Sequence, residues 1–346
     1  MCSSDLQNEE EFKRNEFEKK SNLYQAVMED NKVIRLRDSV FAPLWVQEKP
    51  VGLLYIDRDN IMTRDTELLD VFAHHVAFAI ENMRLQKEIE QKQALEHELN
   101  LASRIQNSLL PKSFPTIPGI EMYGLTKSAK EIGGDYFDVL YSDDNLHFCI
   151  GDVSGKGVPA GLIMSELRSI VRSFAITNNS PKEILLKTAK LLLQDIGGSG
   201  KFVSMILFQW DGKKLLYSSA GHEHILHYKT STGKCEAYRS GGVVLGVDFR
   251  SFSHLVKEKS LDWDPGDVLV LFTDGAPEAK NMDKEMFKLP TLQKTIEKYA
   301  SLATREMVDS ILRDILEFVG EAEQHDDITL LGIKYLSSLT PPVIKA

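Results

Sequence analysis

One long helical stretch divides this sequence into two parts. Residues 66–110 contain neither glycine nor proline, and Pro111 then ends the pattern, because proline lacks the N–H that a helix needs. The stretch therefore predicts a helix from about Thr66 to Leu110, with folded segments before and after it. In its first half, apolar residues recur at steps of three and four, as on one face of a helix: Leu68, Leu69, Phe72, Val76, Ala79, Ile80 and Met83.

The second half of this helix, residues 81–110, carries a narrower apolar seam among glutamates and lysines. Two heptad positions form the seam: Leu85, Lys92 and Leu99 in one, and Leu95, Ala102 and Leu109 in the other. Such a seam is typical of a coiled coil or signalling linker and predicts a homodimer. A single helix packed on its own domain is the alternative, because Lys92 and Gln106 interrupt the apolar pattern.

Composition limits the class of protein. The 346 residues exceed one average domain of about 100–200 residues, and 42% hydrophobic with 27% charged residues is typical of globular chains. A formal net charge of −10 disfavours a general nucleic-acid binder. Three widely spaced cysteines predict neither a disulfide framework nor a zinc site. Without a secretory signal or an apolar span of about 20 residues, we expect a soluble cytoplasmic protein with no membrane partner.

Beyond a proline-rich boundary at residues 111–120, strand and helix patterns alternate in blocks. The helix that opens at Pro159 has Ile163, Leu167, Ile170 and Phe174 on one face. Strands are expected around a turn at Ser142–Asn145, on both sides of turns at Asp211–Gly212 and Thr232–Gly233, before Asp274 and after Asp327. Two further helices are expected, one from Pro181 and one over 304–320. Successive hairpins with paired helices predict an antiparallel α+β layered domain rather than a parallel fold.

Four acidic residues stand at the ends of predicted strands, next to glycine or to another acid: Asp135, Asp152, Asp274 and Asp326. Carboxylates, backbone carbonyls and water are the ligands that Mg²⁺ and Mn²⁺ prefer. Two such ions lower the pKa of a shared water and hold a phosphoryl oxygen for in-line attack. Taken singly, each aspartate is also explained as a turn, a cap or a surface acid, so the prediction depends on the order of all four.

That order resembles the metal-dependent protein phosphatases (the PPM, or type-2C, superfamily), in its SpoIIE/RsbU-like branch of bacterial serine phosphatases. The matching segments cover about residues 100–336: ASRIQNSLLP at 102–111, EIGGDYFDV at 131–139, IGDVSGKGVPAGLIM at 150–164, FVSMILFQWD at 202–211, SAGHEHILHY at 219–228, GVVLGV at 242–247, GDVLVLFTDGAPEA at 266–279 and HDDITLLGIKY at 325–335.

The resemblance implies an α-β-β-α sandwich with two metal ions, Mg²⁺ or Mn²⁺, in the cleft between the sheet edges. Carried over by position, Asp152 bridges both ions and the carbonyl of Val153 binds one. The carboxylates of Asp135, Asp274 and Asp326 complete the two shells and make up, with Asp152, the catalytic set. Asp327 is a second-shell group or an alternate ligand.

This sequence departs from the family pattern after the bridging aspartate. Many eukaryotic relatives have a histidine there as general acid, whereas this chain continues to Lys156. His222 and His224 are weaker candidates for that role, with a structural function as the alternative. Lys156 either holds phosphate or is a solvated loop lysine. The segment GGDYF also looks like the GG[DE]EF of diguanylate cyclases, but Tyr136 replaces the acid at its fourth position.

In the segment SVFAPLWVQEKPVGLLYIDRDN, two strand-like runs are joined by the polar turn QEKP and predict a hairpin. With the following helix, the segment resembles the C-terminal half of a GAF sensor domain, which closes with a hairpin and an output helix. Only 38 residues precede Ser39, so we expect a truncated α/β module. The predicted organisation is a charged arm (1–38), a partial GAF-like segment (39–80), a helical linker (81–113), a PPM/SpoIIE-like phosphatase domain (114–338) and a tail (339–346).

The leading functional hypothesis is a protein serine/threonine phosphatase that hydrolyses a phosphoserine or phosphothreonine monoester by metal-activated water. By resemblance, its substrate is a phosphorylated anti-anti-sigma (STAS) protein in a partner-switching pathway of stress response and sigma-factor regulation. The alternatives are a catalytically silent sensor-scaffold that binds a partner in the same cleft, and a generic Mg²⁺-dependent hydrolase of small phosphoesters. We further expect the register of the 81–110 helix in a homodimer to control assembly of the metal site.

Overall fold

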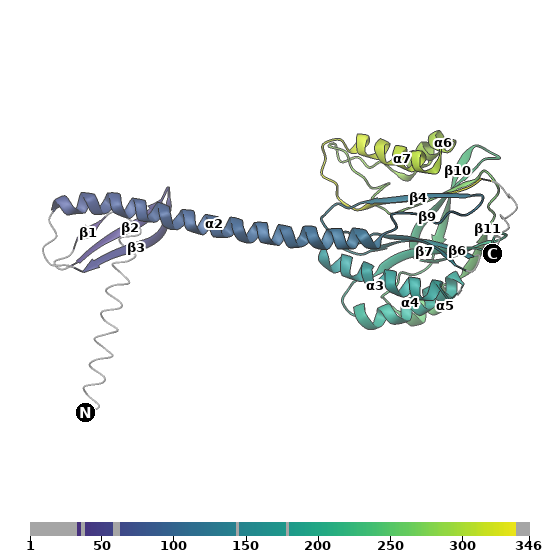
Figure 1. The fold of residues 1–346 in the computed structure, drawn as a ribbon, viewed down its shortest axis with the longest axis horizontal. Coiled ribbons are helices and arrows are strands. Elements are labelled where there is room, and N and C mark those ends of the chain that lie inside the picture. The colour runs from purple at the N-terminus through teal and green to yellow at the C-terminus, as the bar shows by residue number, and fades with distance from the viewer. Residues whose placement is uncertain (1–32, 36–38, 58–62, 143–144, 178–179, 337–346) are drawn as a thin grey trace, which may run out of the picture. The chain divides into compact units, whose positions relative to one another are not determined.

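The computed structural model describes residues 33–35, 39–57, 63–142, 145–177 and 180–336 (Figure 1). The chain separates into two compact units, Met1–His97 and Glu98–Ala346, here called the N-terminal and C-terminal units. Helix α2 (Thr63–Leu109) runs through the boundary, which confirms the predicted long helix to within a few residues. The predicted arm, except for Val33–Arg35, and the predicted tail lie outside the described residues.

The N-terminal unit contains a three-stranded antiparallel sheet in the order β1-β2-β3. Its strands are β1 (Ile34–Arg35), β2 (Ser39–Val46) and β3 (Lys49–Asp57). The predicted hairpin is confirmed, but its turn is shorter than the predicted QEKP. Val46 pairs with Lys49 and Trp45 with Pro50, so only Gln47 and Glu48 form the turn, with Gln47 at φ 57°.

Helix α2 contacts this sheet through small residues. Ala73 and Ala77 are fully buried in a cluster with Ala42 and Leu44 of β2. Several large apolar residues of the predicted α2 face are exposed instead: Leu68, Phe72, Ile80 and Met83. A sheet of only three strands covers a narrow stripe of the helix, and alanine allows the backbones of the helix and the sheet to approach closely.

The C-terminal unit is built on two five-stranded antiparallel sheets. One has the order β10-β9-β12-β13-β4 and the other β11-β8-β7-β6-β5. The strands of the first are β4 (Ile120–Lys127), β9 (His222–Lys229), β10 (Lys234–Gly241), β12 (Val268–Phe272) and β13 (Ile328–Tyr335), and those of the second are β5 (Tyr136–Ser142), β6 (Asn145–Val153), β7 (Val203–Trp210), β8 (Leu215–Ala220) and β11 (Glu258–Leu261). The predicted antiparallel α+β fold is confirmed.

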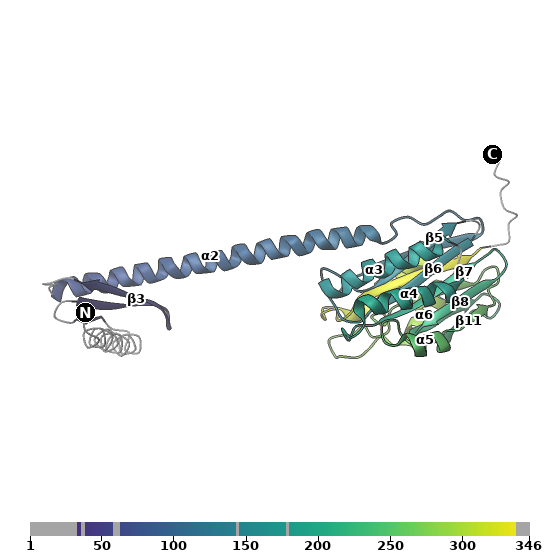
Figure 2. The same cartoon turned by 90° about the horizontal axis from the view of Figure 1, so that it is seen from below.

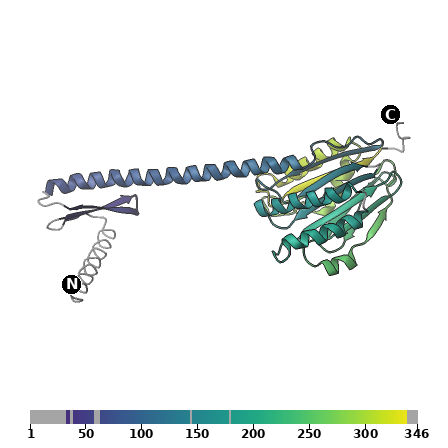
Figure 3. The ribbon, with the colours of Figure 1, turned by 60° about the horizontal axis from the view of Figure 1, so that its bottom comes forward.

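Helices cover the outer face of each sheet, which gives the four layers α-β-β-α (Figure 2 and Figure 3). Helices α3 (Val158–Ala175), α4 (Pro181–Ile196) and α5 (Phe249–Leu255) lie on the side of the second sheet, and α6 (Leu289–Tyr299) and α7 (Thr304–Val319) on the side of the first. The local sequence explains where α4 begins, because Ser180 and Glu183 form a reciprocal capping box at its N-terminus. Among the described residues, no helix is both long and apolar enough to cross a membrane.

The buried face of α3 is rotated from the one predicted. Its fully buried residues are Ala160, Gly161, Met164, Leu167, Val171 and Ala175. Ile163 and Phe174 are only partly buried at the edge of the core. Because small residues turn toward the sheet, α3 lies close to β5 and β6, the strands that carry two of the predicted ligands.

An ion pair between the partly buried Arg172 and the buried Asp138 joins α3 to β5. The guanidinium of Arg172 donates two hydrogen bonds to Asp138, at 2.6 Å from Nε and 2.9 Å from Nη2. Asp138 is 0% exposed, and the hydroxyl of Tyr136 also donates to it. A carboxylate this deeply buried needs its cation, since removal of one partner leaves an uncompensated charge.

We therefore predict that Arg172→Met lowers the free energy of unfolding by about 3 kcal/mol. Urea denaturation followed by far-UV circular dichroism measures the change. The matched control is Lys298→Met, which breaks an exposed pair with Asp314 and should have little effect. Equal effects of the two substitutions would contradict the assigned role of Arg172.

Candidate metal centre

The four predicted ligand aspartates lie at the same end of the two sheets. Asp135 directly precedes β5, and Asp152 is the penultimate residue of β6. Asp274 follows β12, and Asp326 shortly precedes β13. In each sheet the two strands pair antiparallel, so the start of one lies beside the end of the other. The sandwich therefore brings together residues that are far apart in the sequence.

The electrostatics show that these carboxylates act on one another. Burial, followed by the charges of Asp274 and Asp326, raises the pKa of Asp152 to about 7. Burial and then the charge of Asp326 raise the pKa of Asp274 to about 6. Burial and then the charge of Asp152 hold the pKa of Asp135 well above its usual range. This end of the sandwich thus concentrates negative charge that a cation would neutralise.

Glycine allows the chain to approach closely at Val153. A Cβ atom on Gly134 would lie 2.7 Å from the carbonyl oxygen of Val153, closer than side-chain carbons approach an oxygen. The segment that leads into Asp135 is therefore packed directly against the backbone oxygen that the sequence predicts as a ligand.

Two threonines orient Asp135, and sequence reasoning missed both. The hydroxyl of Thr273 donates to Oδ2 of Asp135 at 2.8 Å, and the hydroxyl of Thr329 lies 2.5 Å from the same oxygen. Both threonines are buried. They stand in the motifs FTDG and DDIT beside predicted ligands, but only the fold shows that they point to Asp135.

Asp327 acts as a clamp between loops. Its Oδ1 accepts a hydrogen bond from the Ala129 N–H at 2.7 Å, and its Oδ2 accepts one from the Gly134 N–H at 2.8 Å. Both carboxylate oxygens are thus engaged by backbone groups. Of the two roles predicted for Asp327, this geometry favours the second-shell group.

Gln106 also holds the loop before Asp135, a contact that the sequence analysis did not predict. Its side chain is buried near the end of α2, donates to the carbonyl of Gly133 at 2.7 Å and accepts from the Gly133 N–H at 3.1 Å. This residue interrupts the predicted heptad seam because it faces the folded domain. It connects the end of α2 to the loop that carries Asp135.

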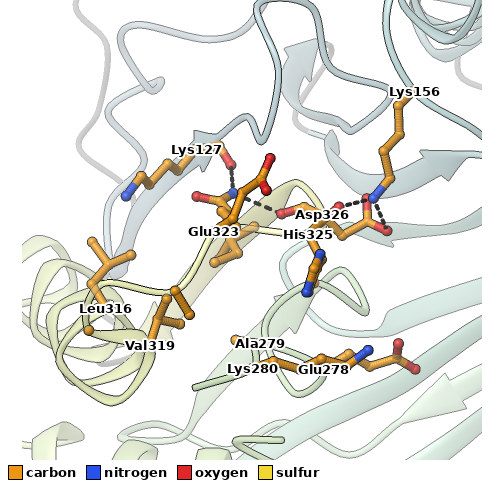
Figure 4. Close-up of a pocket in the computed structure, with 15 residues that line it drawn as sticks. Lys127, Lys156, Glu278, Ala279, Lys280, Leu316, Val319, Glu323, His325 and Asp326 are labelled. Carbon is orange, nitrogen blue, oxygen red and sulfur yellow. Dashed lines mark hydrogen bonds and ion pairs between the residues drawn. The ribbon is translucent and has the colours of Figure 1, made fainter. Parts of the chain in front are cut away.

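The side chain of Lys156 points toward Asp326 and His325 (Figure 4). Its ammonium lies 3.1 Å from Oδ2 of Asp326 and also donates to the carbonyl of His325. A cavity of about 370 Å³ opens beside this pair, between the loop of Asp326 and the end of α7. The lysine is therefore not a freely solvated loop residue.

The two candidate histidines lie elsewhere in the site. His222 is 4% exposed, and burial lowers its pKa to about 4, so it is neutral near pH 7. Its ring lies 3.4 Å from the Ser204 hydroxyl. His224 is paired with Glu223 at 3.5 Å. Neither is poised to donate a proton to a leaving group, which agrees with the structural alternative.

Within the described parts of the chain, no three histidine, cysteine, aspartate or glutamate side chains form a ready-made metal site. Several carboxylate oxygens are held by hydroxyl or backbone groups instead, as on Asp135 and Asp327. The convergent groups are nevertheless all oxygen donors, the set that Mg²⁺ and Mn²⁺ prefer. The residues present therefore fit the predicted type of ion.

Comparison with known proteins shows the family of this chain. The model of the family Stage II sporulation protein E (SpoIIE) matches residues 142–336. The chain belongs to the SpoIIE family. The phosphoserine phosphatase RsbU of Bacillus subtilis (strain 168) is 29% identical over 250 residues, which are 70% of this chain and 71% of RsbU. Protein IcfG of Synechocystis is 28% identical over 68% of this chain, but the match spans only 41% of IcfG.

Solved structures show the same fold. The SiaA-PP2C domain of Pseudomonas aeruginosa has a TM-score of 0.62 at 20% identity, covering 71% of this chain and 98% of that domain. The RsbU and RsbW domains of Rv1364c from Mycobacterium tuberculosis have a TM-score of 0.56 at 26% identity, covering 66% and 64%. The predicted PP2C-like sandwich and the predicted enzyme class, a protein serine/threonine phosphatase, are thereby confirmed for this SpoIIE-family chain.

The raised pKa values predict how the metal-free protein responds to pH. The carboxyl of Asp152 has its pKa raised from 3.8 to about 7, so the folded state holds this proton more tightly than the unfolded chain does. The associated stability is complete below about pH 4 and is lost as the pH rises through 7. In EDTA, we expect Tm to fall between about pH 5 and pH 8, and Asp152→Asn to weaken this fall.

Differential scanning calorimetry across that pH range measures the effect. The control is Asp262→Asn, which removes an exposed acid outside the cluster. If Tm depends on pH in the same way in wild type and in Asp152→Asn, the pKa of Asp152 is not raised in the folded protein.

Proposed function

We propose that this SpoIIE-family chain removes phosphate from a phosphoserine or phosphothreonine of a small anti-anti-sigma (STAS) protein, by water activated at two Mg²⁺ or Mn²⁺ ions. The observation that carries the proposal is the convergence of four aspartates at one end of the sandwich. Burial and then the charges of neighbouring aspartates raise the pKa of three of them, Asp135, Asp152 and Asp274. The relatives support it, since RsbU is named a phosphoserine phosphatase and Rv1364c joins an RsbU domain to an RsbW domain.

The residues that would hold the ions are those predicted from the sequence: Asp152 for both, the Val153 carbonyl for one, and Asp135, Asp274 and Asp326 to complete the shells. When bound, such ions lower the pKa of a water and polarise the phosphoryl group. The protein's part is to orient the carboxylates. Thr273 and Thr329 fix one oxygen of Asp135 and leave its other oxygen for a ligand.

A catalytically silent scaffold is the second candidate, in which the same cleft only binds a partner. The presence of all four aspartates favours an enzyme, because a protein that had lost catalysis would have no need to keep this costly concentration of charge. A generic hydrolase of small phosphoesters is the third, and the choice of substrates in one assay separates the three.

We predict that Asp152→Asn and Asp274→Asn each lower phosphate release by at least about 100-fold, since even outer partners of metal sites typically cost 10–100-fold. The assay measures phosphate released from a phosphorylated STAS protein and from p-nitrophenyl phosphate, with Mn²⁺ or with EDTA. Asp262→Asn is again the control. Near wild-type turnover in either variant, or full turnover in EDTA, contradicts the metal mechanism.

The substrate pattern is equally informative. Rapid release from the STAS protein relative to p-nitrophenyl phosphate supports the proposed substrate. Release from p-nitrophenyl phosphate alone indicates the generic hydrolase, and binding of the STAS protein without release indicates the scaffold.

We also propose that α2 regulates the enzyme as part of a homodimer. Among the described residues, several apolar side chains of α2 between 81 and 109 are exposed: Met83, Leu85, Ile89, Leu95, Leu101 and Ile105. Leu85 and Leu95 belong to the predicted seam, in which Leu99 is half-buried. A second copy of the helix is the partner that a heptad seam fits. The hydrogen bonds from Gln106 to Gly133 supply a path from the end of this helix to the Asp135 loop.

We predict that Leu95→Glu with Leu99→Glu dissociates the dimer and changes phosphatase turnover, because buried glutamates repel across the seam. Sedimentation velocity and phosphate release measure the two effects. The control is Gln93→Glu with Asn100→Glu, which adds the same charge outside the seam. If the seam variant keeps wild-type mass and turnover, α2 is only a tether.

A further inference from the structure

Lys156 forms an ion pair with Asp326, one of the four aspartates of the candidate metal centre. It stands four residues after Asp152 on a glycine-flanked loop, and Gly155 and Gly157 both have positive φ, at 92° and 76°. The loop delivers the ammonium to Asp326 at 3.1 Å and to the carbonyl of His325 (Figure 4). These are an anionic oxygen and a backbone oxygen, the same kinds of donor that a hard divalent cation takes.

Other lysines near the site do not share this position. The Lys201 ammonium lies over Gly155, where a Cβ atom would clash with it, and Lys280 lines the cavity beside Asp326. Among the described residues, neither ammonium has a carboxylate within ion-pair distance, whereas Lys156 has Asp326. The contact of Lys156 is therefore specific and not a general feature of a basic rim.

We propose that Lys156 is an internal cation that competes with a divalent ion for Asp326. The inference rests on the proposed function, because it assumes that Asp326 is a metal ligand. In the metal-free protein, the ammonium neutralises part of the charge gathered at this end of the sandwich. When a divalent ion binds Asp326, the ammonium must leave this oxygen. The free energy needed to displace it lowers the affinity of the site for the ion.

This competition has two consequences of opposite sign. Removal of the positive charge leaves the metal-free carboxylates uncompensated, so the metal-free fold becomes less stable. The same removal deletes the competitor and its repulsion of the ion, so divalent ions bind more tightly. A lysine that merely supports the loop would, when replaced, weaken both stability and metal binding.

The experiment titrates Mn²⁺ into metal-stripped full-length protein by isothermal titration calorimetry and records thermal unfolding in EDTA and in saturating Mn²⁺. The variants are Lys156→Gln, Lys156→Arg, which keeps the charge, and Lys280→Gln, which removes a charge from the same cavity without an ion pair. We expect Lys156→Gln to bind Mn²⁺ about tenfold more tightly and to melt at a lower temperature in EDTA but not in Mn²⁺. Lys156→Arg and Lys280→Gln should stay close to wild type.

An Mn²⁺ affinity of Lys156→Gln that is equal to or weaker than that of wild type overturns the competition. An equal gain in affinity for Lys280→Gln also overturns it, because general charge would then explain the effect. If wild type itself binds no Mn²⁺, the metal site of the proposed function fails and this inference fails with it. Neither readout depends on phosphatase activity, so a failure of the substrate assignment leaves the test intact.

Discussion

Mutual repulsion of carboxylates is the constraint around which the C-terminal unit is organised. Burial raises the pKa of Asp135, Asp152, Asp274 and Asp327, and neighbouring carboxylates add to each shift. Such a cluster costs stability unless other groups compensate it. Here threonine hydroxyls compensate Asp135, backbone N–H groups bind both oxygens of Asp327, and the ammonium of Lys156 pairs with Asp326. The fold thus stores an unfavourable arrangement that a divalent cation would relieve.

The loop of residues 133–135 shows how this arrangement is held in place. Gln106 at the end of α2 binds both backbone groups of Gly133, and Asp327 before β13 accepts from the N–H of Gly134. The loop is therefore fixed from one helix and from the opposite sheet. The position of Asp135 therefore depends on both anchors, one of which lies near the end of α2.

The sequence predicted most strands and helices of the C-terminal unit, although not β4, α5, β11 or α6, and it predicted the buried faces less well. The order of strands and helices and the antiparallel pairing follow from turns and periodicity, which are local properties. The buried face of α3 was displaced, because Ala160 and Gly161 turn to the sheet although Ile163 is more apolar. The same reason applies to α2, where alanines rather than Phe72 contact the small sheet. Where the backbones of a helix and a sheet approach closely, small residues are favoured at the contact, and the hydrophobic pattern of the sequence does not predict this.

By itself, the sequence determined the chemical inventory: four aspartates in a specific order, oxygen donors suited to hard cations, and a helix without a break before them. These features can be predicted from the sequence because the spacing of motifs and the positions of helix-breaking residues are local properties of the chain. Only the tertiary structure decided which groups serve the aspartates. The threonine pair on Asp135, the clamp of Asp327, the turn of Gln106 away from its seam and the contact of Lys156 with Asp326 all join residues far apart in sequence, and only the packing of two sheets brings them within hydrogen-bonding distance.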